Sequence, residues 1–272
     1  MPDHVDTGRF EIFQPKFERQ LAIDAFAALP PSHPMVALLE LDVTDPLDAI
    51  AGLRRGGTRV SLFAFLVRSI AVAIAEHPDL NLIRHGRRLV RFEDVDVSVP
   101  VEVTTPDGKF PREIVIRRAH LQSPAEIYAT IEAARTLHQE TGSTSAEDRW
   151  SRRLMHALRF VPAFIRRRLM RVFMRNAFTV KRRAGTTLVT SVGKFASIPG
   201  FAFTFSTGPR AAAFAVGGVV EKPCVVGGRI EARSVLSLSI MINHDLLDGA
   251  PAARFAARLR TLVESGAGLQ PE

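Results

Sequence analysis

Residues 235–249, with the sequence VLSLSIMINHDLLDG, contain the most informative pattern in this chain. Large apolar residues alternate along its first half, and this predicts a largely buried β-strand. His244 follows where the strand should end. Asp248 and Gly249 then supply turn and capping chemistry, and Pro251 suits the first turn of a helix. A histidine at a strand end, four residues before a carboxylate, suits acid–base chemistry, although a loop histidine and a helix cap would show the same spacing.

The neighbouring segments strengthen the first interpretation. His244-x-x-x-Asp248-Gly249, after a serine-containing strand and before an alanine-rich helix, resembles the signature of the chloramphenicol acetyltransferase-like superfamily. Within it, the chain is most similar to the catalytic domain of the dihydrolipoamide acyltransferases of 2-oxoacid dehydrogenase complexes. Residues 63–81, 113–119 and 208–217 also look like segments of that domain. The resemblance implies an α/β fold: a two-layer sandwich of a mixed β-sheet and packed helices, forming one domain over residues 1–272.

The resemblance also implies a set of site residues. His244 would be the general base of acyl transfer. Aligning the terminal glycines of residues 185–193 with the corresponding strand of the family makes Thr190 the hydroxyl donor to the oxyanion, and Ser191 the alternative if that alignment is wrong by one residue. Asp248 would hold the loop by pairing with an arginine. We predict no metal site, and the sequence assigns no further cofactor-binding residues.

One departure from the family lies beside the base. Asp245 follows His244 where the family usually has an arginine. A carboxylate at this position should favour the protonated imidazole and removes a positive charge, which leaves the working pH and the acceptor open. Arg19 is a candidate partner for Asp248.

The function implied by the resemblance is CoA-dependent acyl transfer. The acyl group would move between a CoA thioester and either a dihydrolipoyl-type thiol or a small hydroxyl or amine acceptor. Acyl-CoA would be a substrate, no covalently attached lipoyl group is expected on this chain, and a lipoyl-carrying protein would be a partner. The family builds each site from two subunits of a trimer, so the resemblance implies a homotrimer, with larger assemblies left open.

Residues 142–183 depart most from the family, which has a short connection there. Apolar residues recur at three- and four-residue steps between Leu154 and Val172, and Pro162 should divide the segment into two helices or kink it. Residues 149–183 hold eleven Arg, one Lys and no acid, so the rest of a chain with net charge +8 is acidic. We therefore predict a basic amphipathic helical insertion.

Several partners fit this insertion. It could contact an anionic membrane surface, or its apolar face could pack on the protein or on a neighbouring subunit while the arginines face solvent. An acidic protein or the phosphates of CoA would also satisfy the charge, whereas nucleic acid is not expected because no reading motif accompanies it. The alternative function is a non-catalytic trimeric scaffold that binds a membrane or an acidic partner through the insertion.

Composition limits the class of protein. The chain has 272 residues, of which 46% are hydrophobic and 24% charged, as in an ordinary globular protein. The single cysteine, Cys224, excludes an internal disulfide framework. No apolar run is long enough to span a bilayer, and the N-terminal residues lack the pattern of a signal peptide. The sequence predicts a cytoplasmic protein, with peripheral membrane contact as an option.

Overall fold

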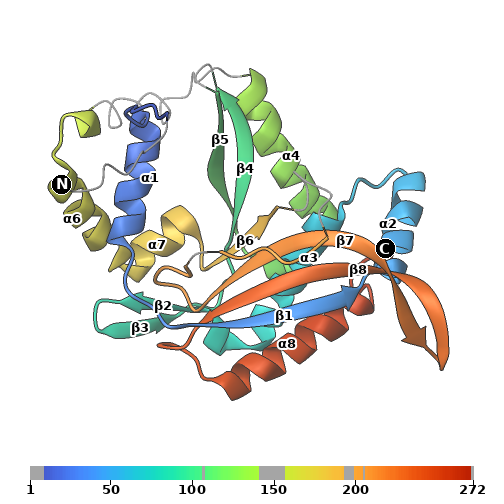
Figure 1. The fold of residues 1–272 in the computed structure, drawn as a ribbon. Helices are drawn as coiled ribbons and strands as arrows, with labels where there is room; N and C mark the ends of the chain where they lie inside the picture. Colours follow the sequence, from blue (N-terminus) through green and yellow to red (C-terminus); the bar gives the residue numbers. More distant parts are fainter. Residues whose placement is uncertain (1–8, 106–107, 141–156, 193–198, 205, 271–272) are drawn as a thin grey trace, which may run out of the picture.

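The computed structural model describes residues 9–105, 108–140, 157–192, 199–204 and 206–270 (Figure 1). The helices are α1 Phe17–Ala28, α2 Thr44–Arg55, α3 Leu62–Glu76, α4 Pro124–Glu140, α6 Ala163–Met174, α7 Ala177–Ala184 and α8 Gly249–Glu264. The strands are β1 Pro34–Asp42, β2 Leu82–His85, β3 Arg88–Arg91, β4 Val97–Thr105, β5 Gly108–Ile116, β6 Thr187–Ser191, β7 Ala212–Val226 and β8 Arg229–Asn243. Within this part of the chain, no helix is both long and apolar enough to cross a bilayer.

The main sheet has the strand order β1-β8-β7-β6-β4-β5. Strand β6 runs parallel to β4 and β7, and the other neighbours are antiparallel, so the sheet is mixed as predicted. Strands β7 and β8 form a long hairpin that turns at Gly227 and Gly228, both in the left-handed region that glycine tolerates. Strands β2 and β3 form a separate two-stranded sheet.

The two faces of the sheet differ because side chains alternate along each strand. The core face of β8 carries Leu236, Leu238, Ile240 and Ile242, which are buried in one cluster with residues of α3 and α8. Figure 1 shows α8 running along the sheet beneath β1 and β8. The opposite face, called here the second face, carries Ser237, Ser239 and Met241 from β8. On the edge strand β1 it exposes Val36 and Leu38, at 45% and 50%.

The basic segment departs from one sequence expectation. Pro162 lies directly before α6 and separates it from the helical residues 157–159, in line with the predicted division. However, Ile165, Leu169 and Val172 are exposed, whereas Arg166 is 7% exposed. The alternative in which the apolar face packs on the same protomer is therefore wrong for α6, and packing on a neighbouring subunit stays a prediction. Leu154 lies outside the described residues.

An ion-pair cluster explains this inversion. Arg166 donates from Nε and Nη2 to Oδ2 of Asp24, over 2.8 and 2.6 Å, and Arg167 donates to Oδ1 over 2.8 Å. Asp24 belongs to α1, which lies beside α6 (Figure 1), and its carboxylate is fully buried. A buried carboxylate without a partner would strongly destabilise the folded chain. The ion pairs with Asp24 therefore hold Arg166 and Arg167 against α1.

Gly185 connects α7 to β6 in a backbone conformation reserved for glycine, with φ +67° and ψ −175°. A Cβ at this position would lie 2.5 Å from the carbonyl oxygen of Asp96. We expect Gly185→Ala to lower the free energy of unfolding by about 1–3 kcal/mol, from backbone strain of this kind. Urea denaturation should show this loss. As a control, Gly52→Ala fills open space within α2 and should be neutral or stabilising, so equal losses would contradict this account.

Candidate functional site

His244 lies directly after the last residue of β8. Its backbone N–H donates to the carbonyl oxygen of His33 over 2.9 Å, which ties the loop to the residue before β1. The imidazole is half-exposed, and its Nδ1 atom lies 3.8 Å from Oδ1 of Asp248. This separation is too long for a hydrogen bond but close enough for electrostatic attraction when the imidazole is protonated. The structure therefore brings together the two residues of the sequence motif at an accessible strand end.

Asp248 occupies the N-cap position of α8, as the sequence predicted, although its side chain makes no capping hydrogen bond. Its side chain is 86% exposed. Within the described residues, the ion-pair contact recorded for Asp248 is with His244 rather than with Arg19, so the suggested pairing with Arg19 is absent from this chain.

The carboxylate of Asp245, the residue after the proposed base, contacts two other side chains. Its Oδ1 atom lies 2.9 Å from Nδ1 of His33, and its Oδ2 atom lies 3.5 Å from Nη2 of Arg84. The hydrogen bond with His33 is the main reason that the pKa of Asp245 lies below its ordinary value, with Arg84 and His244 contributing through charge. Asp245, which stands where the family usually has an arginine, thus interacts mainly with His33 and Arg84.

Thr190 and His244 are far apart within this chain. Thr190 on β6 lies opposite Ala215 on β7, which in turn lies opposite Ser239 on β8. His244 follows Ser239 by five residues, which is about 16 Å along an extended strand. In the perpendicular direction, the two spacings from β6 to β7 and from β7 to β8 separate Thr190 from Ser239 by about 10 Å. One protomer therefore cannot bring the hydroxyl of Thr190 to the imidazole of His244.

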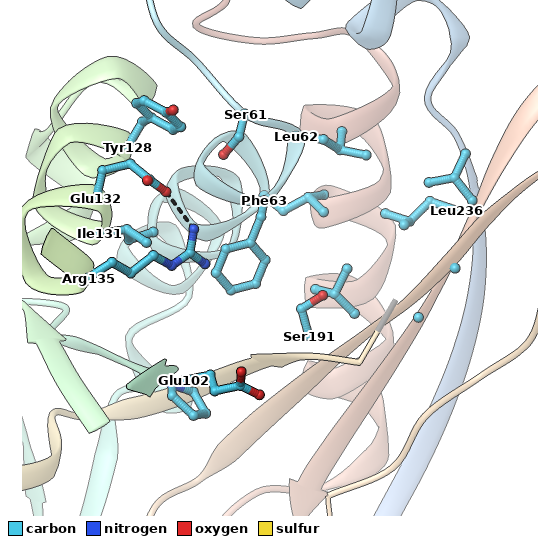
Figure 2. Close-up of a pocket in the computed structure, with 16 residues that line it drawn as sticks. Ser61, Leu62, Phe63, Glu102, Tyr128, Ile131, Glu132, Arg135, Ser191 and Leu236 are labelled. Atoms are coloured by element: carbon cyan, nitrogen blue, oxygen red, sulfur yellow. Dashed lines mark hydrogen bonds and ion pairs between the residues drawn. The ribbon is translucent and has the colours of Figure 1, made fainter. Parts of the chain in front are cut away.

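Thr190 and its neighbour Ser191 point to opposite faces of the sheet. Thr190 lies in register with Ser239 and so belongs to the second face, whereas Val189 belongs to the buried core. Ser191 lines a cavity of about 720 Å³ between α3, α4 and the sheet (Figure 2). The two candidate hydroxyl groups therefore face different environments, a distinction that the sequence alignment left open.

This cavity combines apolar walls with charged groups. Figure 2 shows Leu62, Phe63 and Ile131 around it, together with the ion pair between Arg135 and Glu132. A large apolar cavity with a few polar groups is a usual candidate for a ligand site, but this cavity does not include His244. It does adjoin the end of β6 where Thr190 lies.

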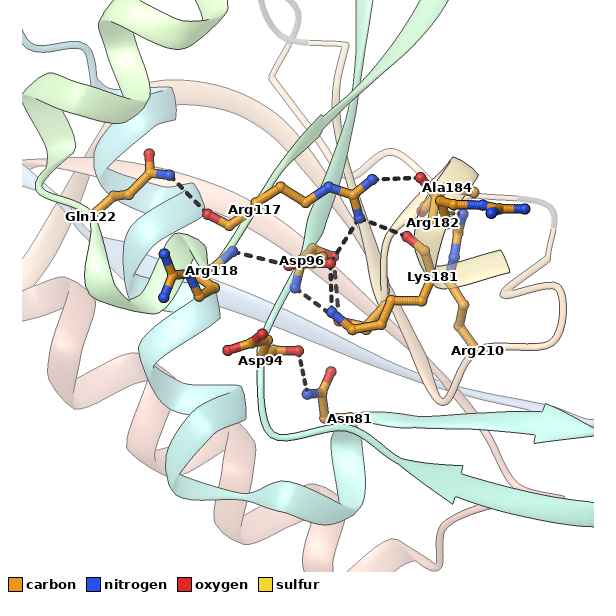
Figure 3. A network of polar contacts seen from close by, with 11 residues as sticks. Asn81, Asp94, Asp96, Arg117, Arg118, Gln122, Lys181, Arg182, Ala184 and Arg210 are labelled. Carbon is orange, nitrogen blue, oxygen red and sulfur yellow. Dashed lines mark hydrogen bonds and ion pairs between the residues drawn. The ribbon is translucent and has the colours of Figure 1, made fainter. Parts of the chain in front are cut away.

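A polar network around Asp96 fixes the start of β6, and sequence reasoning missed it. The buried carboxylate of Asp96 accepts hydrogen bonds from Lys181 over 2.7 Å and from Arg117 over 2.8 Å, and it also accepts one from the backbone N–H of Arg118 (Figure 3). Burial acts to raise the pKa of Asp96, but these hydrogen bonds outweigh it and lower the pKa. The available signal was an acid in the valine-rich stretch of residues 95–103.

The architecture defines the class of domain. It is the fold of dihydrolipoamide acyltransferase catalytic cores, as the sequence resemblance implied. A truncated catalytic core of the 2-oxoacid dehydrogenase complex from Thermoplasma acidophilum superposes with a TM-score of 0.68 at 21% identity, covering 95% of this chain and all of that one. A probable dihydrolipoamide acetyltransferase from Listeria monocytogenes 4b F2365 gives a TM-score of 0.66 at 20% identity, covering 97% and 98%.

The sequence comparisons are more specific. Residues 179–269 match the family model of the 2-oxoacid dehydrogenases acyltransferase catalytic domain. The lipoamide acyltransferase component of the branched-chain α-keto acid dehydrogenase complex of Bacillus subtilis (strain 168) is 24% identical over 84% of this chain and 46% of its own length. The predicted resemblance to these catalytic domains is confirmed. The chain spans about half the length of the curated relatives it matches.

Proposed function

We propose that this chain is a CoA-dependent acyltransferase whose site is shared between two copies of the chain. The observation that carries the proposal is the separation of two chemical groups within one protomer. His244 is exposed at one end of the sheet, and Thr190 lies several residues away along the second face. A neighbouring copy packed on that face would supply the missing partner for each half.

Features of the second face support such packing. Val36 and Leu38 are exposed beside each other on its edge strand, as expected for a surface that a partner covers. A neighbouring copy that covered these two side chains would remove their apolar surface from water. A homotrimer is the assembly we propose, with larger assemblies built from it left open.

The chemistry requires a base and an oxyanion donor. His244 takes the proton from the acceptor's thiol, hydroxyl or amine, and the acceptor atom then attacks the thioester carbonyl. The Thr190 hydroxyl from the neighbouring copy donates to the tetrahedral oxyanion. When this intermediate collapses, the carbon–sulfur bond breaks and the imidazolium returns its proton to the leaving CoA thiolate. Asp248 helps to hold the loop that carries the base, with its Oδ1 atom 3.8 Å from Nδ1 of His244.

A dihydrolipoyl-type thiol on a separate protein or domain is the acceptor that we propose. The relatives that match most of this chain are named as lipoamide acyltransferases and dihydrolipoyllysine-residue succinyltransferases. A small hydroxyl or amine acceptor would use the same base.

Complementation between two variants tests the shared site. His244→Ala and Thr190→Ala should each be inactive alone. When the two chains are co-expressed with different tags and mixed trimers are purified, about one site in three should pair an intact histidine with an intact threonine, because each cyclic interface joins different surfaces of two copies. Thiol release from acyl-CoA should return in the mixed trimers. Absence of recovery in confirmed mixed trimers would contradict a site shared in this way.

A non-catalytic scaffold is the second candidate function, and the exposed apolar side chains of α6 favour it. Phe164, Leu169 and Val172 are at least 55% exposed beside several arginines, a composition that suits an anionic surface. A scaffold would release no thiol in any mixture of the two variants or in the unmodified protein. The complementation assay therefore also separates the two candidate functions.

A further inference from the structure

A second cavity, of about 280 Å³, lies beside the loop that carries His244. It is bounded by residues 28–31 between α1 and β1, by the turn of the β2–β3 hairpin and by the end of α6. Figure 1 places these elements at the same end of the molecule. The cavity connects to the proposed site through Arg84, which lines it and also contacts Asp245, the residue after the base.

Three arginines line this cavity: Arg84, Arg171 and Arg175. The described residues that line the cavity include no acidic side chain. Among the described residues, no carboxylate forms an ion pair with Arg171 or Arg175. By contrast, Arg166 and Arg167 on the same helix are both paired with Asp24. The cavity therefore carries uncompensated positive charge. The helix dipole alone favours arginines at the C-terminal end of α6. It does not explain why Arg171 and Arg175 line the same cavity as Arg84, which lies on β2.

The rest of the lining is apolar and includes Leu29, Pro30 and Met174. Arginine presents a rigid fork of N–H donors that matches phosphate oxygens, and its planar group also stacks on aromatic rings. A cavity of this volume is at the lower limit for a complete small-molecule ligand, so it suits one end of a longer molecule. A nucleotide, with phosphate groups and a flat base carried by the same sugar, suits both parts of the lining.

We propose that this cavity binds the phosphate-bearing nucleotide end of coenzyme A, with Arg171 and Arg175 holding phosphate oxygens and the apolar wall contacting the base. This inference rests on the proposed function for its ligand, but its residues are separate from the acyl-transfer groups. Helix α6 thereby acquires a role: its paired arginines attach it to α1, and its C-terminal end presents Arg171 in the last turn and Arg175 at the C-cap to the cavity.

Calorimetric titration of the full chain tests this site with two fragments of the ligand. Adenosine 3′,5′-bisphosphate carries the phosphates without the thiol arm, and pantetheine carries the thiol arm without the phosphates. The double variant Arg171→Gln/Arg175→Gln should bind adenosine 3′,5′-bisphosphate at least about 10-fold more weakly, since it loses charge-assisted hydrogen bonds. Its affinity for pantetheine should not change.

The matched control is Arg168→Gln/Arg183→Gln, which removes the same charge from exposed positions outside the cavity. It should retain the affinity of the unmodified protein. Equal weakening in both double variants, or unchanged binding in the first, would overturn the proposal. Inorganic phosphate competing as well as the bisphosphate would overturn the nucleotide assignment, as would arginine-dependent binding only to phosphatidylglycerol vesicles. Because fragment binding requires no turnover, arginine-dependent binding without acyl transfer would refute the proposed function and leave the site intact.

Discussion

Replacing His244 by alanine should slow acyl transfer by about 10²–10⁴-fold, the usual contribution of a positioned general base. The imidazole is exposed at the end of β8, so its removal leaves no buried cavity and should not unfold the chain. The measurement is thiol release from acyl-CoA in the presence of a dihydrolipoyl acceptor. The loss should fall mainly on kcat, because the imidazole acts on the proton transferred during reaction.

A second histidine provides the control for this experiment. His120, in the short 3-10 helix between β5 and α4, lies outside the proposed site. The His120→Gln variant should retain turnover. Turnover of the His244→Ala variant at the rate of the unmodified protein would eliminate His244 as the base, provided that both preparations have the same circular dichroism spectrum.

Replacing Asp24 by asparagine should lower the free energy of unfolding by about 3 kcal/mol, as expected when one partner of a buried ion pair is removed. The substitution leaves the Arg166 guanidinium buried beside a neutral amide and weakens the attachment of α6 to α1. Urea denaturation at a fixed protein concentration provides the measurement. The control is Asp48→Asn on α2, where the carboxylate is exposed, and a change within about 0.5 kcal/mol is expected there.

The same cluster should make stability depend on pH. Burial acts to raise the pKa of Asp24, but hydrogen bonds from Arg166 and Arg167 outweigh it, so the folded pKa is lower than the ordinary value. Its stabilising contribution is therefore complete above the unfolded pKa, near pH ~4, and is lost as the pH falls through the folded pKa. The Asp24→Asn variant should lose less stability than the unmodified protein over this acidic range. An identical acid dependence would contradict this assignment.

Most of the fold could be predicted because its signals are local. The alternation of apolar residues predicts the buried face of β8, and the capping and turn residues after it predict the start of α8. Apolar residues from Leu62 to Ile74 follow the helical period and predict α3. Prediction is weaker at the N-terminus, where the spacing of apolar residues predicts a helical segment over residues 9–31 but helix forms at Phe17–Ala28. The sequence predicts a short strand over residues 113–117, whereas β5 begins at Gly108 because pairing with β4 extends it.

The site was predicted in part. The motif placed His244 and Asp248 together, since four residues across a strand end and a turn are close by geometry. The sequence could not decide between Thr190 and Ser191. Register across three strands was needed to show that Thr190 lies on the second face and that Ser191 lines a cavity.

The sequence by itself determined the order of strand, histidine, turn and helix at the C-terminus, because periodicity and capping depend on neighbours a few residues apart. Only the tertiary structure decided where the charges find partners. Asp24 and Arg166 are 142 positions apart, and His33 and Asp245 are 212 apart, so no local pattern could pair them. Electrostatic attraction depends on distance in space and on burial, and both arise only when distant segments pack together.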